Sequence, residues 1–545
     1  MKKRIGKKNI KQLVGKVLVI ALALGLMGCS DKKDSKKETN VPETPIVNEM
    51  PNDFPGGNPN LPGGNPNNQG TTATINYSSL DGSAMFKDRD LESEYSRDGA
   101  VNITLKENDI STSSDVVAIS DNKVIISAEG TYIVKGDLND GQIVVEADKT
   151  AKIRIVFEGV NISNSGTSPL FIKQADKVFL TIAEGTDNSL ITKGEFIETE
   201  DGIDATLFSK EDLTINGSGS LKIECESGMG IASKDDLVIV ESNVQINAGS
   251  HGLDSNDSIR LKDCNLNIKS GKDGLHSENN DDTSLGYIYI ASGDININAE
   301  DDGITALSNL VIDGGNINIE RSNEGLEGAI VEINGGTVNL KADDDGINAT
   351  SPDTDEEDFF GGREDMMGDS SLYIRISGGV THINAGGDGI DSNGNIFVTG
   401  GETYVAGPEN NGNGALDYAM EAHITGGIFV ATGASGMAQN FTYAENQGAI
   451  LVNIQAMTNE KTVLKDSEGN DVLVFEPDKS YNSALISCPE IVDGKSYKVD
   501  IGGNETEVTM SGLIYGNSGM GGMHGGMPGG RPGGRPDGMG PDMMR

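Results

Sequence analysis

Several residue types that mark common protein classes are scarce in this chain of 545 residues. It has no tryptophan, 5% of its residues are aromatic, and it holds four cysteines. The cysteines have no CxxC spacing and no paired pattern, so neither a disulfide framework nor a cysteine zinc site is predicted. Cys225, Cys264 and Cys488 are expected to be buried thiols. The low aromatic content also argues against a compact enzyme core.

Positive charge is scarce as well. There are 42 Lys and Arg against 84 Asp and Glu, which gives a formal net charge of -42. Loss of residues 1–28, which hold seven basic side chains and no acidic one, takes this to -49. Such a surface repels nucleic acid and bare polyanions. We therefore predict no nucleic-acid partner, and a divalent cation between this chain and any acidic polymer.

Long apolar runs are missing apart from one near the N-terminus. Residues 17–27 are apolar and follow the basic segment, a pattern typical of a secretion signal. At 11 residues the run is shorter than the ~20 of a membrane-spanning helix. It ends in LMGC, which we interpret as a lipobox with Cys29 diacylated; the alternative is a chance cysteine after an ordinary signal. We predict a lipoprotein signal peptide at 1–28 and a chain anchored to the outer face of the bacterial cell membrane, at the cell surface.

Two segments have low complexity. Residues 29–73 repeat PGGNPN and are predicted to be a disordered linker. Residues 516–545 are predicted to be a disordered Gly/Met/Pro tail. Its Met520, Met523, His524 and Met527 are of the type that binds soft copper, although a flexible tail is the favoured interpretation.

The main signal is an internal repeat of glycine followed by an aliphatic residue. The glycines are Gly202, Gly230, Gly252, Gly274, Gly303, Gly325, Gly346 and Gly389. Their spacings are 28, 22, 22, 29, 22, 21 and 43 residues, so the unit is about 22 residues with loop insertions. A second motif, a polar residue before Gly-Gly, recurs at 313–315, 334–336, 377–379, 399–401 and 425–427.

About 22 residues make three short strands and three turns, which is one coil of a solenoid, and coils must stack to bury their apolar faces. We predict an all-β fold: a right-handed parallel β-helix over 74–440, with a loop insertion at 351–370. Residues 441–515 are predicted to form a small β-rich C-terminal cap that covers the last coil.

Acidic side chains gather beside the repeated glycines, where stacking places them in columns. Neighbouring coils are ~4.8 Å apart, so bare carboxylates repel by ~3.5 kcal/mol at a dielectric of 20. Ca²⁺ holds oxygens at ~2.3–2.6 Å and so bridges this step. The predicted ligands are Asp201, Asp204, Asp254, Asp273, Glu278, Asp301, Asp302, Glu324, Glu327, Asp344, Asp345, Asp388 and Asp391. The alternative is a solvated face of Asp-rich turns.

A few other residues are candidates for contact with a glycan. His251, His276 and Lys272 lie in or next to the same columns and are predicted to bind an acidic sugar; random surface placement is the alternative. Lys272 and Arg260 are the candidates for a catalytic base. Tyr287, Tyr289, Tyr373 and Tyr404 are candidate sugar platforms, with strand packing as the alternative. Polyuronate with calcium is favoured over a neutral glycan.

At this point the chain resembles a known family. The matching stretches are GTYIVKGDLNDGQIVVEA at 130–147, VFEGVNIS at 156–163, AEGTDNSL at 183–190, the GI(D/N)xx repeats through Asn393, and LISCPEIVDGKSYKV at 485–499. These resemble bacterial carbohydrate-binding proteins with a polysaccharide-lyase-like right-handed β-helix. The resemblance implies extracellular binding of carbohydrate such as cellulose or polygalacturonate, and bound calcium, but no demonstrated catalysis. The repeat at Gly230 lacks the acidic residues and is expected to bind no metal.

Three functions remain open. The first is a monomeric, calcium-dependent extracellular polysaccharide-binding lipoprotein for an acidic (pectic) or cellulosic glycan. The second is a calcium-dependent lyase of polyuronate, although the paired-arginine signature of pectate lyases is not visible. The third is a structural or adhesive cell-surface β-solenoid. Binding without catalysis is the favoured expectation.

Overall fold

The computed structural model describes residues 80–107, 109–351 and 368–516. Within these ranges the chain is almost entirely β, and its single helix is the 3-10 turn η1 (Gly82–Ala84). Among the residues described, there is no helix with the length and apolarity that a membrane crossing requires. The predicted signal peptide, Cys29, the linker at 29–73 and the copper candidates of the tail lie outside the described residues.

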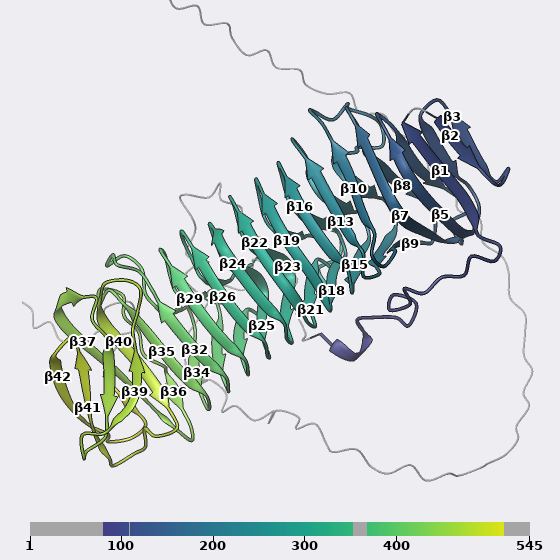
Figure 1. The fold of residues 1–545 in the computed structure, drawn as a ribbon. Coiled ribbons are helices and arrows are strands. Elements are labelled where there is room, and N and C mark those ends of the chain that lie inside the picture. The colour runs from purple at the N-terminus through teal and green to yellow at the C-terminus, as the bar shows by residue number, and fades with distance from the viewer. Residues whose placement is uncertain (1–79, 108, 352–367, 517–545) are drawn as a thin grey trace, which may run out of the picture. The chain divides into compact units, whose positions relative to one another are not determined.

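Parallel strands stack coil upon coil, and each coil contributes one strand to each of three faces (Figure 1). The first face consists of β6 (Gln142–Glu146), β8 (Leu170–Gln174), β11 (Ala205–Ser209), β14 (Met229–Ser233), β17 (Leu253–Ser255), β20 (Leu275–Ser277), the starts of β23 (Ile304–Ile312) and β25 (Leu326–Ile333), β27 (Ile347–Ala349), β30 (Ile390–Ser392) and β33 (Asp417–Tyr418).

The second face consists of the start of β7 (Lys152–Asn164), β9 (Lys177–Ile182), β12 (Asp212–Asn216), β15 (Asp236–Val240), β18 (Ser258–Lys262), β21 (Tyr287–Ile290), the ends of β23 and β25, β28 (Tyr373–Ile376), β31 (Asn395–Val398), β34 (Ala422–Ile424) and β36 (Tyr443–Ala444).

The third face consists of the end of β7, β10 (Asp187–Thr192), β13 (Ser220–Cys225), β16 (Asn243–Ala248), β19 (Cys264–Ser270), β22 (Gly293–Ala299), β24 (Asn316–Ser322), β26 (Thr337–Ala342), β29 (Val380–Ala385), β32 (Glu402–Ala406) and β35 (Ile428–Gly433). The prediction of an all-β parallel β-helix is therefore confirmed.

Two kinds of glycine set the shape of a coil. A Cβ on Gly252 would lie 2.6 Å from the carbonyl oxygen of Gly274 and 2.4 Å from a methyl group of Ile268, so the stacked coils leave no room for a side chain. In the Gly-Gly turns, the second glycine has a positive φ, as in Gly315 (+96°) and Gly336 (+82°), which favours glycine. The repeated glycines therefore mark close approach at one corner and left-handed backbone at another.

The core is a set of aliphatic ladders that run through the stack. One ladder on the first face comprises Leu253, Leu275, Ile304, Leu326, Ile347 and Ile390, all fully buried. Adjacent members pair in parallel register, so each side chain is covered by its counterpart in the next coil. The insertion at 351–370 falls between β27 and β28, and Ile347 still pairs with Ile390, as the sequence predicts.

The first predicted repeat unit is wrong in register. Leu207 pairs with Ile231, so Thr206 and not Gly202 occupies the position equivalent to Gly230. Gly202 has a φ of +64° in a loop before β11, and nothing approaches its Cβ position. Ile203 packs instead in an outer apolar cluster with Phe208. A Gly-Ile pair in this loop therefore imitates the repeat.

An N-terminal strap, residues 80–98, covers much of the second face (Figure 1). Met85 packs against Tyr289 and Val311. Further along the strap, the buried Asp90 accepts from Thr214 Oγ1 at 2.7 Å and lies 2.8 Å from Lys177 Nζ. The first and third faces have no such cover from the strap contacts described.

Antiparallel strands lie at both ends of the stack. At the N-terminal end β1 (Val101–Glu107) pairs with β2 (Asp109–Thr112), β3 (Val117–Ser120) pairs with β4 (Lys123–Ile126), and β5 (Gly130–Leu138) joins β1 to β7. The C-terminal end contains β37 (Gly448–Thr458), β38 (Thr462–Lys465), β39 (Asp471–Phe475), β40 (Tyr481–Cys488), β41 (Ser496–Ile501), β42 (Asn504–Thr509) and β43 (Ile514–Tyr515). Since β40 pairs antiparallel with β35, it ends the parallel stack. Cys225, Cys264 and Cys488 are buried thiols, as predicted.

Candidate functional site

An acidic stripe follows the corner between the third and first faces. It consists of two adjacent columns, one residue per coil. The first column holds the residue before each coil glycine: His251, Asp273, Asp302, Glu324, Asp345 and Asp388, whose carbonyls accept from the glycine of the preceding coil. The second holds the middle residue of each short first-face strand: Asp254, His276, Thr305, Glu327, Asn348, Asp391 and Asp417.

Stacking leaves this corner partly buried and crowded with like charges. Burial, reinforced by neighbouring carboxylates, raises the pKa of Glu324 to about 8 and that of Glu327 to about 7. The pKa values of Asp388 and Asp391 rise to about 7 for the same reasons. Those of Asp302 and Asp345 rise to about 6, again with burial as the largest cause. The stripe therefore resists full ionisation unless another positive charge is present.

Two groups of carboxylates converge closely enough to share an ion. The ligand atoms of Asp345, Asp388 and Asp391 lie within 4.8 Å of one another, and so do those of Asp273, Asp301 and Asp302. Both groups offer only oxygen, which is the donor that Ca²⁺ prefers.

Some buried oxygens in and beside the stripe have no partner. Among the described residues, Thr305 Oγ1, Asn348 Oδ1 and Asp204 Oδ1 are buried without a hydrogen bond. Buried polar atoms are usually satisfied, so each is expected to have a partner that binds there. The donor set and the orphaned oxygens fit a hard divalent cation.

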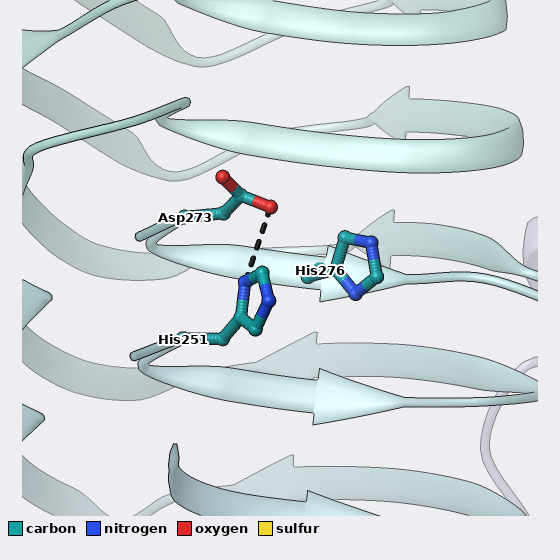
Figure 2. A group of neighbouring side chains, drawn as sticks. All are labelled: His251, Asp273 and His276. Atoms are coloured by element: carbon teal, nitrogen blue, oxygen red, sulfur yellow. Dashed lines mark ion pairs between the residues drawn. The ribbon is translucent and has the colours of Figure 1, made fainter. Parts of the chain in front are cut away.

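Histidines interrupt the carboxylates at one end of the stripe (Figure 2). His276 Nδ1 lies 2.8 Å from Asp254 Oδ1, and His251 Nδ1 lies 3.1 Å from Asp273 Oδ2. The two imidazoles stack with centroids 4.5 Å apart. Burial opposes the charged form of His276, but the bond to Asp254 outweighs it and raises the His276 pKa. Burial raises the Asp254 pKa, and the same bond more than offsets it, so the net shift is downward.

The remaining predicted acidic residues lie at the edges of the stripe or away from it. Glu278, Asp301 and Asp344 are adjacent to it in the chain, and Glu278 and Asp301 reach His276 and Asp273 respectively. Asp201 instead pairs with Lys210 at 2.8 Å. Because the first repeat is out of register, Asp201 and Asp204 do not belong to the two columns.

The two candidate catalytic bases have different surroundings. Lys272 is exposed in the residue next to Asp273. Arg260 lies on β18 of the second face, where it pairs with Asp236 and donates to the Met85 carbonyl of the strap at 3.0 Å. It is 5% exposed, so the strap separates it from any glycan on the acidic stripe. The expectation that Arg260 lies near the columns is wrong, because its strand turns to a different face.

An amide ladder on the third face was not predicted. It consists of Gln245, Asn267, Asn296, Asn318 and Asn339, which pair in register from coil to coil and continue into His382 and Tyr404. Three grooves of about 570, 380 and 960 Å³ lie along it, and neighbouring grooves share or adjoin members of the ladder. The signal in the sequence is an amide at the same position of successive repeats, as in NLNIK, DININA and NINIE.

The largest groove has an aromatic wall. His382 stacks on Tyr404 at 5.1 Å, and Tyr404 stacks on Phe475 of β39 at 5.6 Å. Of the four candidate tyrosine platforms, Tyr404 alone lines a described groove. Tyr287 and Tyr289 pack with the strap, and Tyr373 donates to Glu332 at 2.7 Å. Strand packing therefore accounts for these three.

The fold and its two polar columns define a carbohydrate-binding class of acidic parallel β-helix, and the comparisons agree. Residues 120–354 match the model of a family described as carbohydrate-binding domain-containing protein. This confirms the predicted resemblance over these residues, in a narrower range than the sequence motifs cover.

Two similar proteins come from one bacterial lineage of cellulose-era naming aside, and each is similar over part of this chain. A carbohydrate-binding domain-containing protein of Acetivibrio thermocellus is 38% identical over 138 residues, which are 25% of this chain and 48% of that relative. The chain thus spans about half the length of the curated relative that it matches. A solved structure, the gadolinium derivative of the polysaccharide lyase-like protein from C. thermocellum, has 32% identity and a TM-score of 0.39, covering 44% of this chain and 92% of that one.

Proposed function

We propose that this chain is a calcium-dependent polysaccharide-binding lipoprotein at the bacterial cell surface, which holds acidic glycans such as polygalacturonate. The observation that carries the proposal is the acidic stripe, with its convergent carboxylates and buried oxygens without partners. The family match at 120–354 supports carbohydrate as the ligand class. The basic and apolar N-terminal segment that ends at Cys29 supports export and anchoring.

Calcium links the two negative partners. Ca²⁺ takes 6–8 oxygen ligands, and a group such as Asp345, Asp388 and Asp391 supplies only part of that number. The remaining positions are open to carboxylates and hydroxyls of a glycan. Without the ion, the negative stripe repels a polyuronate chain.

The amide ladder favours a second ligand, a neutral glycan such as cellulose. Carboxamide groups donate and accept hydrogen bonds, as sugar hydroxyls do, and carry no charge to screen. The stacked Tyr404 and Phe475 add an apolar wall for a sugar ring at one end. Binding in these grooves does not need calcium.

The test is retention of the full chain on polygalacturonate and on cellulose, each with calcium or with a chelator. We expect polygalacturonate retention to vanish with chelator and cellulose retention to persist. Polygalacturonate retention that chelator leaves unchanged contradicts the calcium role. A blank result on both polymers, with calcium only raising the melting temperature, supports a structural or adhesive solenoid instead.

The same samples report catalysis. Absorbance from 4,5-unsaturated uronate in the calcium sample identifies a lyase. Replacement of the exposed Lys272 by alanine then decides whether that residue is the base, because loss of absorbance with retained binding assigns the role to it.

A further inference from the structure

The histidine end of the acidic stripe differs in chemistry from the rest of it. The ligand atoms of His251, Asp273 and His276 lie within 4.8 Å of one another, and they combine two imidazole nitrogens with one carboxylate (Figure 2). Imidazole nitrogen suits zinc, copper and nickel, whereas Ca²⁺ selects oxygen. The same stripe therefore presents two donor sets to two classes of ion.

His251 gives the independent indication that something binds here. The residue is 8% exposed, and its Nδ1 atom makes no hydrogen bond although it lies 3.1 Å from Asp273 Oδ2. The contact lacks the geometry of an N–H donor on a carboxylate. A buried imidazole nitrogen in this state is rare unless it has a further partner.

The neighbours of the other two ligands hold them in place for coordination. Asp273 Oδ1 accepts from the Asp302 backbone at 3.1 Å, which leaves Oδ2 facing His251. His276 uses Nδ1 for Asp254, which leaves Nε2 for an ion, with Glu278 Oε2 3.5 Å away. A carboxylate on the far nitrogen of a ligating histidine is the usual support in metal sites.

We propose that His251, Asp273 and His276 form a binding site for a divalent transition-metal ion of the zinc type, separate from the all-oxygen groups of the acidic stripe. Three protein ligands leave coordination positions for water or an incoming ligand. The proposal does not depend on glycan binding, since it rests on the donor atoms alone.

The test is a Zn²⁺ titration of the full chain in excess Ca²⁺, repeated on His→Gln variants of each of its five histidines. We expect one Zn²⁺ per chain. His251→Gln and His276→Gln each weaken Zn²⁺ binding by more than the about 10–100-fold expected for Asp254→Asn, which removes only the supporting carboxylate. The controls His382→Gln, His423→Gln and His524→Gln retain full affinity, and His524→Gln also tests the methionine-rich tail.

Three outcomes overturn the proposal: no Zn²⁺ uptake, displacement of Zn²⁺ by Ca²⁺, or equal losses in a control variant. A second measurement covers variants that fail to fold. Pulsed electron paramagnetic resonance of the Cu²⁺-loaded His524→Gln chain is expected to show two coordinated imidazoles. A signal from no imidazole nitrogen contradicts the site without any change to His251 or His276.

Discussion

The first and third faces of this β-helix share their coils and their register, yet their outer columns have opposite chemistry. On the first face, Glu327 pairs in register with Asn348, and that residue with Asp391, in a stripe whose carboxyl groups crowd one another. On the third face, Asn296 and Asn318 repeat at the same spacing, and their amides bond to each other at 3.4 Å. A ladder of amides satisfies itself, whereas a ladder of carboxylates needs a counter-ion.

The largest expected effect is the response of the acidic stripe to pH and calcium. Its carboxyls have higher pKa values in the folded chain than in the unfolded one, as for Glu324 at about 8 and Asp391 at about 7. The folded chain therefore binds more protons, and without calcium its stability falls as pH rises from about 5 to about 8. We expect a loss of several kcal/mol in urea unfolding with chelator.

Calcium is expected to reverse this loss, because it binds the ionised form. At a hundred times its Kd, one ion contributes about 2.7 kcal/mol. A stability that is flat across this pH range with chelator, or that calcium does not change at about pH 8, contradicts the account of the stripe.

A change to the shared backbone is expected to affect both faces. Gly252→Ala places a Cβ 2.6 Å from the Gly274 carbonyl oxygen, so neighbouring coils must separate. We expect a loss of about 1–3 kcal/mol in urea unfolding and weaker retention on both polymers. The control Gly412→Ala lies in a loop whose nearest neighbour is a side-chain atom at 3.2 Å, and it should be near neutral. Loss on one polymer alone indicates that the faces do not share their support.

A change confined to the acidic stripe separates the faces. Asp388→Asn with Asp391→Asn removes two charges from one carboxylate group and keeps the side-chain shape. We expect about tenfold weaker calcium-dependent retention on polygalacturonate, a free-energy change of about 1.4 kcal/mol, with cellulose retention unchanged. The charge-matched control is Asp115→Asn with Asp471→Asn, two exposed positions outside the stripe. Equal losses in control and variant indicate a general effect of net charge.

The smallest expected effect is on the third face. Tyr404→Ala removes the middle ring of the His382, Tyr404 and Phe475 stack. Each aromatic contact is worth about 0.5–1.5 kcal/mol, so cellulose retention should fall severalfold while calcium uptake stays the same. Cellulose retention equal to that of the unchanged chain places the neutral glycan elsewhere.

Much of this arrangement follows from the sequence because a coil repeats its contacts. Gly252 and Gly274 recur where backbones nearly touch, so their spacing predicts the coil and the alignment of the acidic columns. The spacing does not distinguish Gly202, which lies in a loop. Nor does it show that the strap buries Arg260, since that contact joins Met85 to a residue 175 positions away. The amide ladder was visible in the repeats, but asparagine is also common in turns.

The most direct measurement is calorimetric titration of the full chain with Ca²⁺ at about pH 8, beside the variant that combines Asp388→Asn with Asp391→Asn. Stacked coils that align carboxylates into an ion-binding stripe predict saturable uptake by the unchanged chain and at least one fewer ion in the variant. No uptake, or the same number of ions in both, contradicts the claim that the acidic stripe is a calcium site.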